Sequence, residues 1–210
     1  MGNLVIVRHG ESNWNAQGKW TGTRNVHLSP KGQHEAEMMG QTLHDMSFDQ
    51  AFYTEQIRTT ETLRMILWNS PTPDIPLTLA PELDERDYGI YTGKNKWQVK
   101  EAIGEEAFQK LRRSWDYPFP EGETLKDVYE RAVPYYKKNI LPLLNAGKSI
   151  LVVAHGNSIR SLVKYIENIS TDDIGDLEMI FGTALIYKVD ADGHMVTKAV
   201  RKIDSPLPPA

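Results

Sequence analysis

The sequence has 210 residues, 40% of them hydrophobic, with 24 Lys and Arg against 28 Asp and Glu and a formal net charge of −4. This length favours one compact domain over residues 1–210, with a frayed tail over about 202–210. The mildly acidic balance argues against a nucleic-acid partner, which would require a basic surface. The absence of Cys excludes disulfides and thiolate metal sites, and no apolar run approaches the roughly 20 residues that cross a bilayer. We therefore expect neither a nucleic-acid nor a membrane partner.

Short apolar runs alternate with longer amphipathic segments along the first half of the chain, a pattern typical of βα units. Residues 4–7 form a continuous apolar run rich in Val and Ile, which predicts a strand buried on both faces. A helix capped by Ser29, with Pro30 in its first turn, should then run to about Met46. The next expected elements are a strand over 49–54, a helix over 55–68, a strand over 77–80 and, in the Gly- and Tyr-rich segment 84–104, a functional loop with a short helix.

The second half of the chain continues the alternation. Residues 105–115 are expected to form a helix with an apolar stripe of Ala107, Phe108, Leu111 and Trp115. A long helix is expected over 123–144, capped by Thr124 and kinked at Pro134. The remaining expected elements are a central strand over 150–153, a helix over 157–167 and strands over 184–189 and 195–200, joined by a turn at Asp192-Gly193. Together these elements predict an α/β fold, a three-layer α/β/α sandwich around a mostly parallel sheet.

Two similar tetrapeptides end the two most apolar expected strands, Val7-Arg8-His9-Gly10 and Val153-Ala154-His155-Gly156. Ligands of open α/β sheets bind outside the carboxyl ends of the strands, so both histidines should meet over one crevice. Either histidine alone could equally cap its strand as a structural residue. Two together, each followed by a glycine that lets the backbone approach a ligand closely, favour a functional site.

Familiar catalytic and nucleotide-binding motifs fail in detail. The segment Gly156-Asn157-Ser158-Ile159-Arg160 begins like a nucleophile elbow but ends in Arg rather than Gly. His34-Glu35 begins like a zincin helix, yet Met38 stands where the second His would be. No Walker loop or dinucleotide-binding glycine fingerprint follows any expected strand. A bound phosphate must therefore be held by side chains and isolated amides.

The residues around the first histidine suit phosphoryl transfer. A neutral imidazole attacks phosphorus directly when hydrogen bonds orient it, and the guanidinium of Arg8, beside His9, matches the oxygens of a phosphate. The transferring group concentrates negative charge on its oxygens, so more than one cation is needed. Arg58, at the start of the second expected helix, is a further candidate, although an Arg in a first helical turn is more often a solvated surface residue.

These residues belong to a longer ordered series: Arg8-His9-Gly10-Glu11-Ser12-Asn13-Trp14-Asn15, Thr21-Gly22, Leu28-Ser29, Arg58, Glu85-Arg86-Asp87-Tyr88-Gly89, Asn95-Lys96, Arg112-Arg113 and His155-Gly156-Asn157-Ser158-Ile159-Arg160. The series resembles the histidine phosphatase superfamily and, within it, the cofactor-dependent phosphoglycerate mutases. The similarity runs from Leu4 to about Val189. The Arg-His-Gly segment marks only the superfamily, whereas the Tyr-Gly, Asn-Lys and Arg-Arg elements point to the mutase branch.

The resemblance implies a role for each matched residue. His9 would become the phosphohistidine, while Arg8, Arg58 and His155 would hold the transferring phosphoryl group. Glu85 would be the general acid and base and would hold a proton in part of the cycle, which a partly buried anionic surrounding would favour. Hydrogen bonds to the substrate would come from Asn15, Thr21, Gly22, Gly156 and Asn157, and its carboxylate end would bind to Tyr88, Lys96, Arg112 and Arg113. Taken alone, Arg112 and Arg113 would be a solvated helix face, but they flank the apolar stripe and could lean into the crevice.

The resemblance implies an enzyme that interconverts 3-phosphoglycerate and 2-phosphoglycerate, primed by 2,3-bisphosphoglycerate and without a metal. This glycolytic role and the lack of targeting signals lead us to expect the cytoplasm. One alternative is a phosphatase of the same fold, in which water takes the phosphoryl group of a small phosphomonoester. Another is an idle phosphometabolite-binding module, which the joint retention of His9, Glu85 and His155 argues against.

The sequence departs from the family near the expected site. An insertion that typically follows Arg113-Ser114-Trp115 is missing, which leaves a homodimer and a monomer both open. Ile57 stands in place of a common Lys, Ile180-Phe181-Gly182-Thr183 replaces the usual Pro-Thr-Gly turn, and the C-terminal tail is truncated or unlike that of relatives. A less covered site admits water more easily, so these departures motivate the phosphatase alternative.

Overall fold

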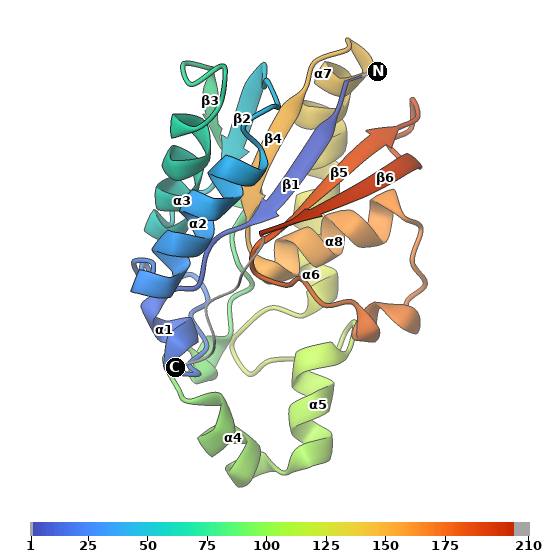
Figure 1. Ribbon diagram of the computed structural model, residues 1–210. Helices are drawn as coiled ribbons and strands as arrows, with labels where there is room; N and C mark the ends of the chain where they lie inside the picture. Colours follow the sequence, from blue (N-terminus) through green and yellow to red (C-terminus); the bar gives the residue numbers. More distant parts are fainter. Residues whose placement is uncertain (1, 204–210) are drawn as a thin grey trace.

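A six-stranded sheet forms the centre of the protein in the computed structural model, which describes residues 2–203 (Figure 1). The strands are β1 (Leu4–Arg8), β2 (Gln50–Tyr53), β3 (Leu77–Leu79), β4 (Ile150–Ala154), β5 (Thr183–Val189) and β6 (Met195–Lys202). They lie in the order β3-β2-β4-β1-β5-β6. The first four in this order are parallel, whereas β5 pairs antiparallel with β1, and β6 pairs antiparallel with β5. The predicted mostly parallel sheet is confirmed.

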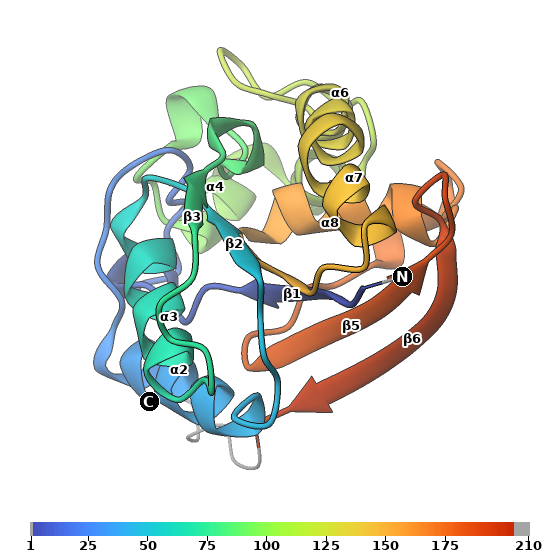
Figure 2. The ribbon, with the colours of Figure 1, turned by 90° about the horizontal axis from the view of Figure 1, so that it is seen from above.

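Helices cover both faces of the sheet (Figure 2). One face carries α2 (Pro30–Thr42) and α3 (Ile57–Trp68), and the other carries α6 (Leu125–Tyr135), α7 (Leu141–Asn145) and α8 (Gly156–Ile166). Because side chains alternate along a strand, Val5 and Val7 of β1 pack into the core with α2 and α3, while Leu4 and Ile6 pack with α6, α7 and α8. The predicted α/β/α sandwich is therefore confirmed. No helix within residues 2–203 is long and apolar enough to cross a membrane.

Further helices lie beyond the carboxyl ends of β1 and β4 (Figure 1). They are α1 (Asn13–Ala16), α4 (Lys96–Ile103) and α5 (Glu105–Arg113). Single 3₁₀ turns occur at Pro81–Leu83, Gly89–Tyr91 and Asp173–Asp176. A third hydrophobic cluster, centred on Trp20, Tyr88 and Phe108, anchors α4 and α5 to the body of the protein. The predicted functional segment 84–104 thus lies at the end of the sheet where ligands of α/β proteins bind.

Two helices end earlier than the sequence predicts. α5 stops at Arg113 because Ser114 has an extended backbone, with φ −65° and ψ 154°. Trp115 therefore leaves the expected apolar stripe, and its ring packs edge-on against Tyr129 with centroids 5.3 Å apart. α2 likewise stops at Thr42, whose hydroxyl donates a hydrogen bond back into the last helical turn.

The single kinked helix predicted over 123–144 is divided in the structure. Its first part, α6, follows the Thr124 cap as predicted, and a π-helical turn over Tyr136–Ile140 then leads into α7. Pro134 and Pro142 lack the amide hydrogen that a regular α-helical turn requires. The π-helical turn lies between these two prolines, so the interruption extends over five residues rather than one kink.

The C-terminal hairpin has the predicted turn but a longer second strand. Gly193 has a φ of +89°, and its N–H donates to the carbonyl of Asp190 over 3.1 Å. β6 continues to Lys202, two residues beyond the predicted end, so the expected frayed tail does not include this residue. Ile203, also placed in that tail, is buried and its N–H donates to the carbonyl of Gly182 over 3.0 Å, and residues 204–210 lie outside the described residues.

Candidate active site

Two buried histidines meet where the central strands end. Strands β1 and β4 are parallel neighbours in which Arg8 pairs with Ala154, so the next residues, His9 and His155, leave the sheet together. Their ring centroids lie 5.0 Å apart, and both side chains are buried. The prediction that both imidazoles share one crevice is confirmed.

One ring nitrogen of His9 is engaged by the backbone and the other is left free by the described residues. Its Nδ1 lies 2.6 Å from the carbonyl oxygen of Gly10, which only accepts hydrogen bonds, so Nδ1 carries the proton and Nε2 keeps a free lone pair. Burial, followed by the positive charges of Arg58 and Arg8, holds the pKa of His9 well below its usual value. The ring is therefore neutral at neutral pH, in the tautomer that leaves Nε2 available for bonding.

A chain of hydroxyl groups orients the second histidine. Nε2 of His155 lies 2.8 Å from the hydroxyl of Thr54, which in turn lies 3.0 Å from the hydroxyl of Thr59. Because the Thr59 hydroxyl donates to backbone carbonyls, the Thr54 hydroxyl donates to Thr59 and accepts from His155. Burial and the charge of Arg58 lower the pKa of His155 well below its usual value. His155 is thus a neutral, fixed ring beside His9.

Two arginines bring positive charge to this pair of histidines. Arg8 donates from Nη1 to the carbonyl of Met179 over 2.6 Å, and its guanidinium lies 3.7 Å from the ring centroid of Phe181. Its Nε is buried without a hydrogen-bond partner in the described chain. Burial lowers the pKa of Arg8, but the charge of Glu85 opposes this shift. Arg8 therefore offers an unused donor beside the nucleophile.

Arg58 is fully buried, so the alternative of a solvated surface residue is wrong. It donates to the carbonyls of Gly22 and Arg24 over 2.9 and 2.8 Å, and to the side chain of Gln56. Burial lowers the pKa of Arg58 to about 10, which still leaves a cation at neutral pH. Its Nε has no partner among the described residues. Arg58 thus fixes the loop over 22–24 and keeps one donor free.

A small cavity beside His9 collects most of the residues expected to hold the phosphoryl group. Its lining consists of Arg8, His9, Asn15, Lys19, Trp20, Thr21, Gly22, Arg58, Glu85, Tyr88 and Lys96. The hydroxyl of Thr21 is buried without a partner in the described chain, so it can donate to a ligand. Gly22 has a φ of +54°, and a Cβ there would lie only 3.3 Å from the Tyr88 ring, so a larger residue would strain this wall.

Glu85 has one carboxylate oxygen engaged and one available. Its Oε1 accepts from the backbone N–H of Arg86 over 2.8 Å, and from the backbone and side-chain amides of Asn157 over 3.2 and 3.0 Å. Oε2 lies 3.6 Å from the position that a Cβ of Gly156 would occupy, which is an ordinary van der Waals distance. Oε2 thus faces the backbone at Gly156, at the start of α8.

The surroundings of Glu85 correct the expectation of an anionic environment. Burial raises the pKa of Glu85, but the hydrogen bonds from Arg86 and Asn157 and the charges of Arg8 and Arg58 outweigh it, so the pKa lies below its usual value. Without a ligand, Glu85 is a carboxylate among cations and donors. The negative charge that would favour its protonated form must therefore come from a bound phosphoryl group.

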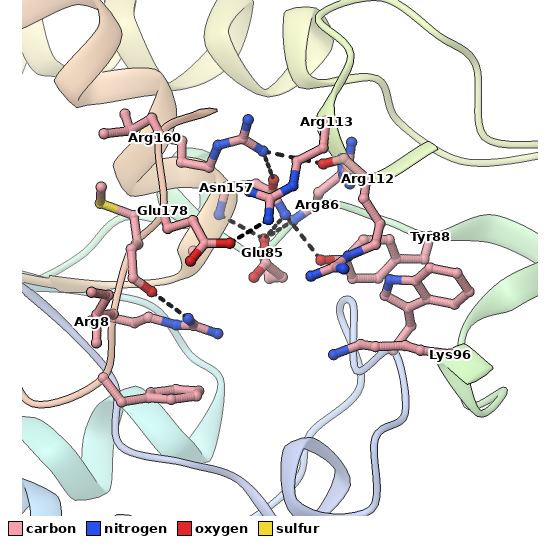
Figure 3. A pocket seen from close by; sticks show the side chains of 16 residues that line it. Arg8, Glu85, Arg86, Tyr88, Lys96, Arg112, Arg113, Asn157, Arg160 and Glu178 are labelled. Atoms are coloured by element: carbon pink, nitrogen blue, oxygen red, sulfur yellow. Dashed lines mark hydrogen bonds and ion pairs between the residues drawn. The ribbon is translucent and has the colours of Figure 1, made fainter. Parts of the chain in front are cut away.

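A larger pocket of about 360 Å³ opens outward from this centre (Figure 3). Its lining consists of Arg8, Trp20, Glu85, Arg86, Tyr88, Lys96, Arg112, Arg113, Gly156, Asn157, Arg160 and residues 177–181. Burial, with the charges of Arg8 and Arg112, lowers the pKa of Lys96 to about 8. Burial and the charge of Glu85 raise the pKa of Tyr88 to about 12, so its hydroxyl stays protonated. The pocket therefore suits a polyanionic small molecule.

Arg112 and Arg113 both line this pocket, which corrects the alternative of a solvated helix face. The guanidinium of Arg112 lies 5.4 Å from the Phe108 ring centroid and is half-buried. Arg113 donates from Nη2 to the carboxylate of Glu178 and from Nη1 to the carbonyl of Gly175 over 3.4 Å. One arginine is thus free for a ligand, whereas the other already has an anionic partner.

The structure adds residues that sequence reasoning missed. Arg86 and Arg160 stood in the matched segments without an assigned role, and both are buried in the pocket wall. Arg86 keeps Nε and Nη1 without partners in the described chain, and Arg160 donates to the side-chain oxygen of Asn157 over 3.2 Å. Of the wall over 177–181, only Ile180 and Phe181 were anticipated, as part of the departure from the family at 180–183. Its approach to Arg8 depends on tertiary folding, and no local pattern predicts it.

No group of three or more His, Asp or Glu side chains within residues 2–203 is arranged to hold a metal ion. The free donors around His9 and Glu85 instead fit an anion. Arg8, Thr21, Arg58 and Arg86 are among the residues with buried donor atoms that have no partner in the described chain. A phosphate ester of suitable size would satisfy these atoms, which otherwise carry a desolvation cost of about 1–3 kcal/mol each.

Comparison with known proteins agrees with this chemistry. The family model of the histidine phosphatase superfamily (branch 1) matches residues 4–202. The chain belongs to this superfamily. A curated member of it, the 2,3-bisphosphoglycerate-dependent phosphoglycerate mutase of Beijerinckia indica subsp. indica, is 41% identical over 202 residues, which span 95% of this chain and 98% of that protein. The resemblance to the cofactor-dependent mutases is therefore confirmed.

Solved structures of the superfamily share the fold at low sequence identity. A mycobacterial glucosyl-3-phosphoglycerate phosphatase in complex with VO3 superposes with a TM-score of 0.81 at 18% identity, over 95% of this chain and 97% of that chain. A phosphoglycerate mutase from Bacillus anthracis str. Sterne gives a TM-score of 0.75 at 22% identity, over 98% of this chain and 93% of that chain. Phosphatases and mutases thus share this architecture, and the fold alone does not separate them.

Proposed function

We propose that this protein is a phosphoglycerate mutase, which interconverts 3-phosphoglycerate and 2-phosphoglycerate through phospho-His9 and is primed by 2,3-bisphosphoglycerate. The observation that carries the proposal is the joint geometry of His9 and Glu85. A neutral imidazole with a free Nε2 and a carboxylate with a free Oε2 face the same basic cavity. The mutase relatives, at 41% identity over nearly full length, support this choice.

The residues of the chain divide the proposed reaction between them. Nε2 of phospho-His9 releases the phosphoryl group to the C2 hydroxyl oxygen of 3-phosphoglycerate, while Oε2 of Glu85 takes the proton of that hydroxyl. In the second half, Nε2 of His9 takes up the phosphoryl group from C3, and Glu85 returns the proton to the C3 oxygen. Arg8 and Arg58 stabilise the charge on the transferring group throughout. Each cycle ends with phospho-His9 restored.

The larger pocket provides for the rest of the substrate. Lys96, Arg112 and Arg113 would hold the carboxylate, and the hydroxyl of Tyr88 would donate to it. Asn15, Thr21, Gly22, Gly156 and Asn157 would contribute hydrogen bonds, in part through their backbone. The primer 2,3-bisphosphoglycerate supplies the phosphoryl group that His9 first accepts. The unpartnered donors of Arg8, Arg58 and Arg86 fit its negative charges.

Phosphatase activity is the second candidate function. The larger pocket opens outward from the centre of the site, and the segment over 180–183 differs from the usual mutase turn. Water that reaches phospho-His9 would release inorganic phosphate. Three further points stay predictions. The enzyme is expected to need no metal and to act in the cytoplasm, and it is expected to be either a monomer or a homodimer.

The test is a coupled assay of isomerisation with and without 2,3-bisphosphoglycerate, with phosphate release measured in parallel. The proposal expects primer-dependent isomerisation that greatly exceeds hydrolysis and is abolished in His9→Ala. Acid-labile label from 32P-bisphosphoglycerate should appear on the wild-type protein and not on the variant. Hydrolysis faster than isomerisation would establish the phosphatase instead. Isomerisation that persists in His9→Ala would overturn both functions.

A further inference from the structure

The outer part of the pocket contains a carboxylate where a ligand would place its own. Glu178 lies in the segment 177–181 and lines the pocket beside Arg113 (Figure 3). Its carboxylate accepts a hydrogen bond from Nη2 of Arg113, and this ion pair lowers the pKa of Glu178. Arg113 is a residue to which the proposed function assigns the distal anion of the substrate. The carboxylate of Glu178 is therefore bound to the same guanidinium, that of Arg113, which this anion would use.

The neighbouring residues hold Glu178 on the pocket side of its segment. The carbonyl of Met179, the next residue, accepts from Nη1 of Arg8 over 2.6 Å. The ring of Phe181 packs against the same guanidinium with 3.7 Å between the Arg8 carbon Cζ and the ring centroid. On the other side, the carbonyl of Gly175 accepts from Arg113 over 3.4 Å. Two cations of the site thus hold the backbone on either side of Glu178, whose side chain is 59% exposed.

Charge at the mouth of the pocket depends strongly on this residue. The lining carries six cationic side chains, those of Arg8, Arg86, Lys96, Arg112, Arg113 and Arg160, and only two carboxylates. One of these carboxylates, Glu85, is buried at the inner end beside Asn157. Glu178 is therefore the carboxylate that faces an incoming distal anion. An anion that binds to Arg113 in place of Glu178 must displace the Glu178 carboxylate. The anion then lies near this carboxylate, which has lost its cationic partner.

We propose that Glu178 is a specificity-determining residue, which weakens ligand binding in proportion to the negative charge that the ligand brings to Arg113. A distal phosphate is opposed most, a distal carboxylate less, and an uncharged distal group not at all. In a mutase this limits the retention of the bisphosphate relative to the monophosphate substrates. The inference rests on the proposed function only in assigning the distal anion to Arg113.

The test measures binding by calorimetry on proteins with and without Glu178→Gln, both carrying His9→Ala so that no phosphoryl group is transferred. The ligands are 2,3-bisphosphoglycerate, 3-phosphoglycerate and glycerol 3-phosphate. Beyond the phosphate on C3 they carry, respectively, a second phosphate with a carboxylate, a carboxylate alone, and only hydroxyl groups. Exposed ion pairs contribute about 0.2–1 kcal/mol, so we expect 3-phosphoglycerate to bind about two- to fivefold more tightly to the variant. The gain should be larger for 2,3-bisphosphoglycerate and absent for glycerol 3-phosphate. It should also shrink at high salt.

Two further variants separate a local effect from a change in overall charge. Glu106→Gln removes the same charge from an exposed residue of α5, paired with Lys110 away from the pocket, and should change no affinity. In an Arg113→Met background the gain from Glu178→Gln should largely disappear, because the pair is already broken. Equal gains for all ligands, or a similar gain in Glu106→Gln, would overturn the inference.

Failure of the inference and failure of the proposed function give different results. If the graded gain in affinity is observed but no primer-dependent isomerisation occurs, the role of Glu178 stands and the mutase assignment fails. If isomerisation occurs but Glu178→Gln leaves all affinities unchanged, the role of Glu178 is wrong and the mutase assignment stands.

Discussion

The side-chain amide of Asn157 donates to Oε1 of Glu85 over 3.0 Å, and this contact joins the start of α8 to the proposed general acid and base. The same amide nitrogen donates to the hydroxyl of Tyr88 over 2.9 Å. Arg160 donates to the amide oxygen over 3.2 Å, which fixes the orientation of the amide. The orientation of the Glu85 carboxylate thus depends on Arg160, which acts on it through Asn157.

Removal of the Asn157 side-chain amide should raise the pKa of Glu85, because this amide donates a hydrogen bond to the charged form, while the backbone N–H of residue 157 keeps its own. Glu85 must be unprotonated to accept the substrate hydroxyl proton, so activity is lost as pH falls through its pKa. In Asn157→Ala the acidic limb of the kcat/KM profile should therefore move to higher pH, and kcat/KM should fall about tenfold or more. Ser161→Ala is the matched control, since its buried hydroxyl on α8 has no partner in the described chain.

Arg160 should act through Asn157 as a positioning residue. Arg160→Met leaves the amide free to rotate, so the acidic limb should shift in the same direction as in Asn157→Ala. The loss of activity should appear mainly in kcat, because Glu85 takes part in proton transfer and not in binding the carboxylate of the substrate. In the Asn157→Ala background, Arg160→Met should produce little additional shift. Additive shifts in the double variant would contradict this route.

Lys96 should make substrate binding sensitive to mildly alkaline pH. Its pKa is lowered to about 8, so the side chain is charged below this pH and becomes neutral above it. Attraction for an anionic ligand is then lost as pH rises through about 8, and KM for 3-phosphoglycerate should rise about tenfold. Lys96→Arg should remove this rise because guanidinium stays charged. Lys94→Arg, at a residue outside the pocket lining, should leave the wild-type profile unchanged.

Phe181 should limit hydrolysis of phospho-His9. Its ring lies 5.9 Å from the His9 ring and packs on Arg8, so it covers one side of the nucleophile. Phe181→Ala should admit water and increase phosphate release relative to isomerisation several-fold. The neighbouring variant Ile180→Ala changes a residue that is 59% exposed and should leave this ratio unchanged. An unaltered ratio in Phe181→Ala would show that the ring does not exclude water.

Trp20 should stabilise the part of the protein that carries the outer pocket. Its ring lies within 6 Å of the rings of Tyr91 and Phe108, at 5.6 and 5.8 Å, in the cluster that anchors α4 and α5. Trp20→Ala should lower the free energy of unfolding by about 3–5 kcal/mol, measured by chemical denaturation. Trp68→Ala, at a residue that is 88% exposed, should change it by less than about 0.5 kcal/mol.

Features set by local pattern and strand order could be predicted from the sequence. The apolar runs of β1 and β4 predicted the central strands of the sheet. Because parallel strands end at the same edge, the sequence also predicted that His9 and His155 lie close together. The environment of Glu85 could not be predicted, because its partners come from α8 and from arginines distant in the chain. The pairing of Arg113 with Glu178 was missed for the same reason. The division of the helix after Pro134 depends on how the backbone redistributes its hydrogen bonds, which composition does not specify.

The pairing of β1 with β4 has a consequence for how the protein folds. Leu4 pairs with Ile150, so most of the chain must be synthesised and partly ordered before the two histidines can meet. Contacts between such distant segments carry a large loop-closure cost and form slowly. Recovery of enzymatic activity during refolding should therefore lag behind the recovery of helical signal. A nascent chain that lacks residues beyond 150 would contain His9 but no site in which it could react.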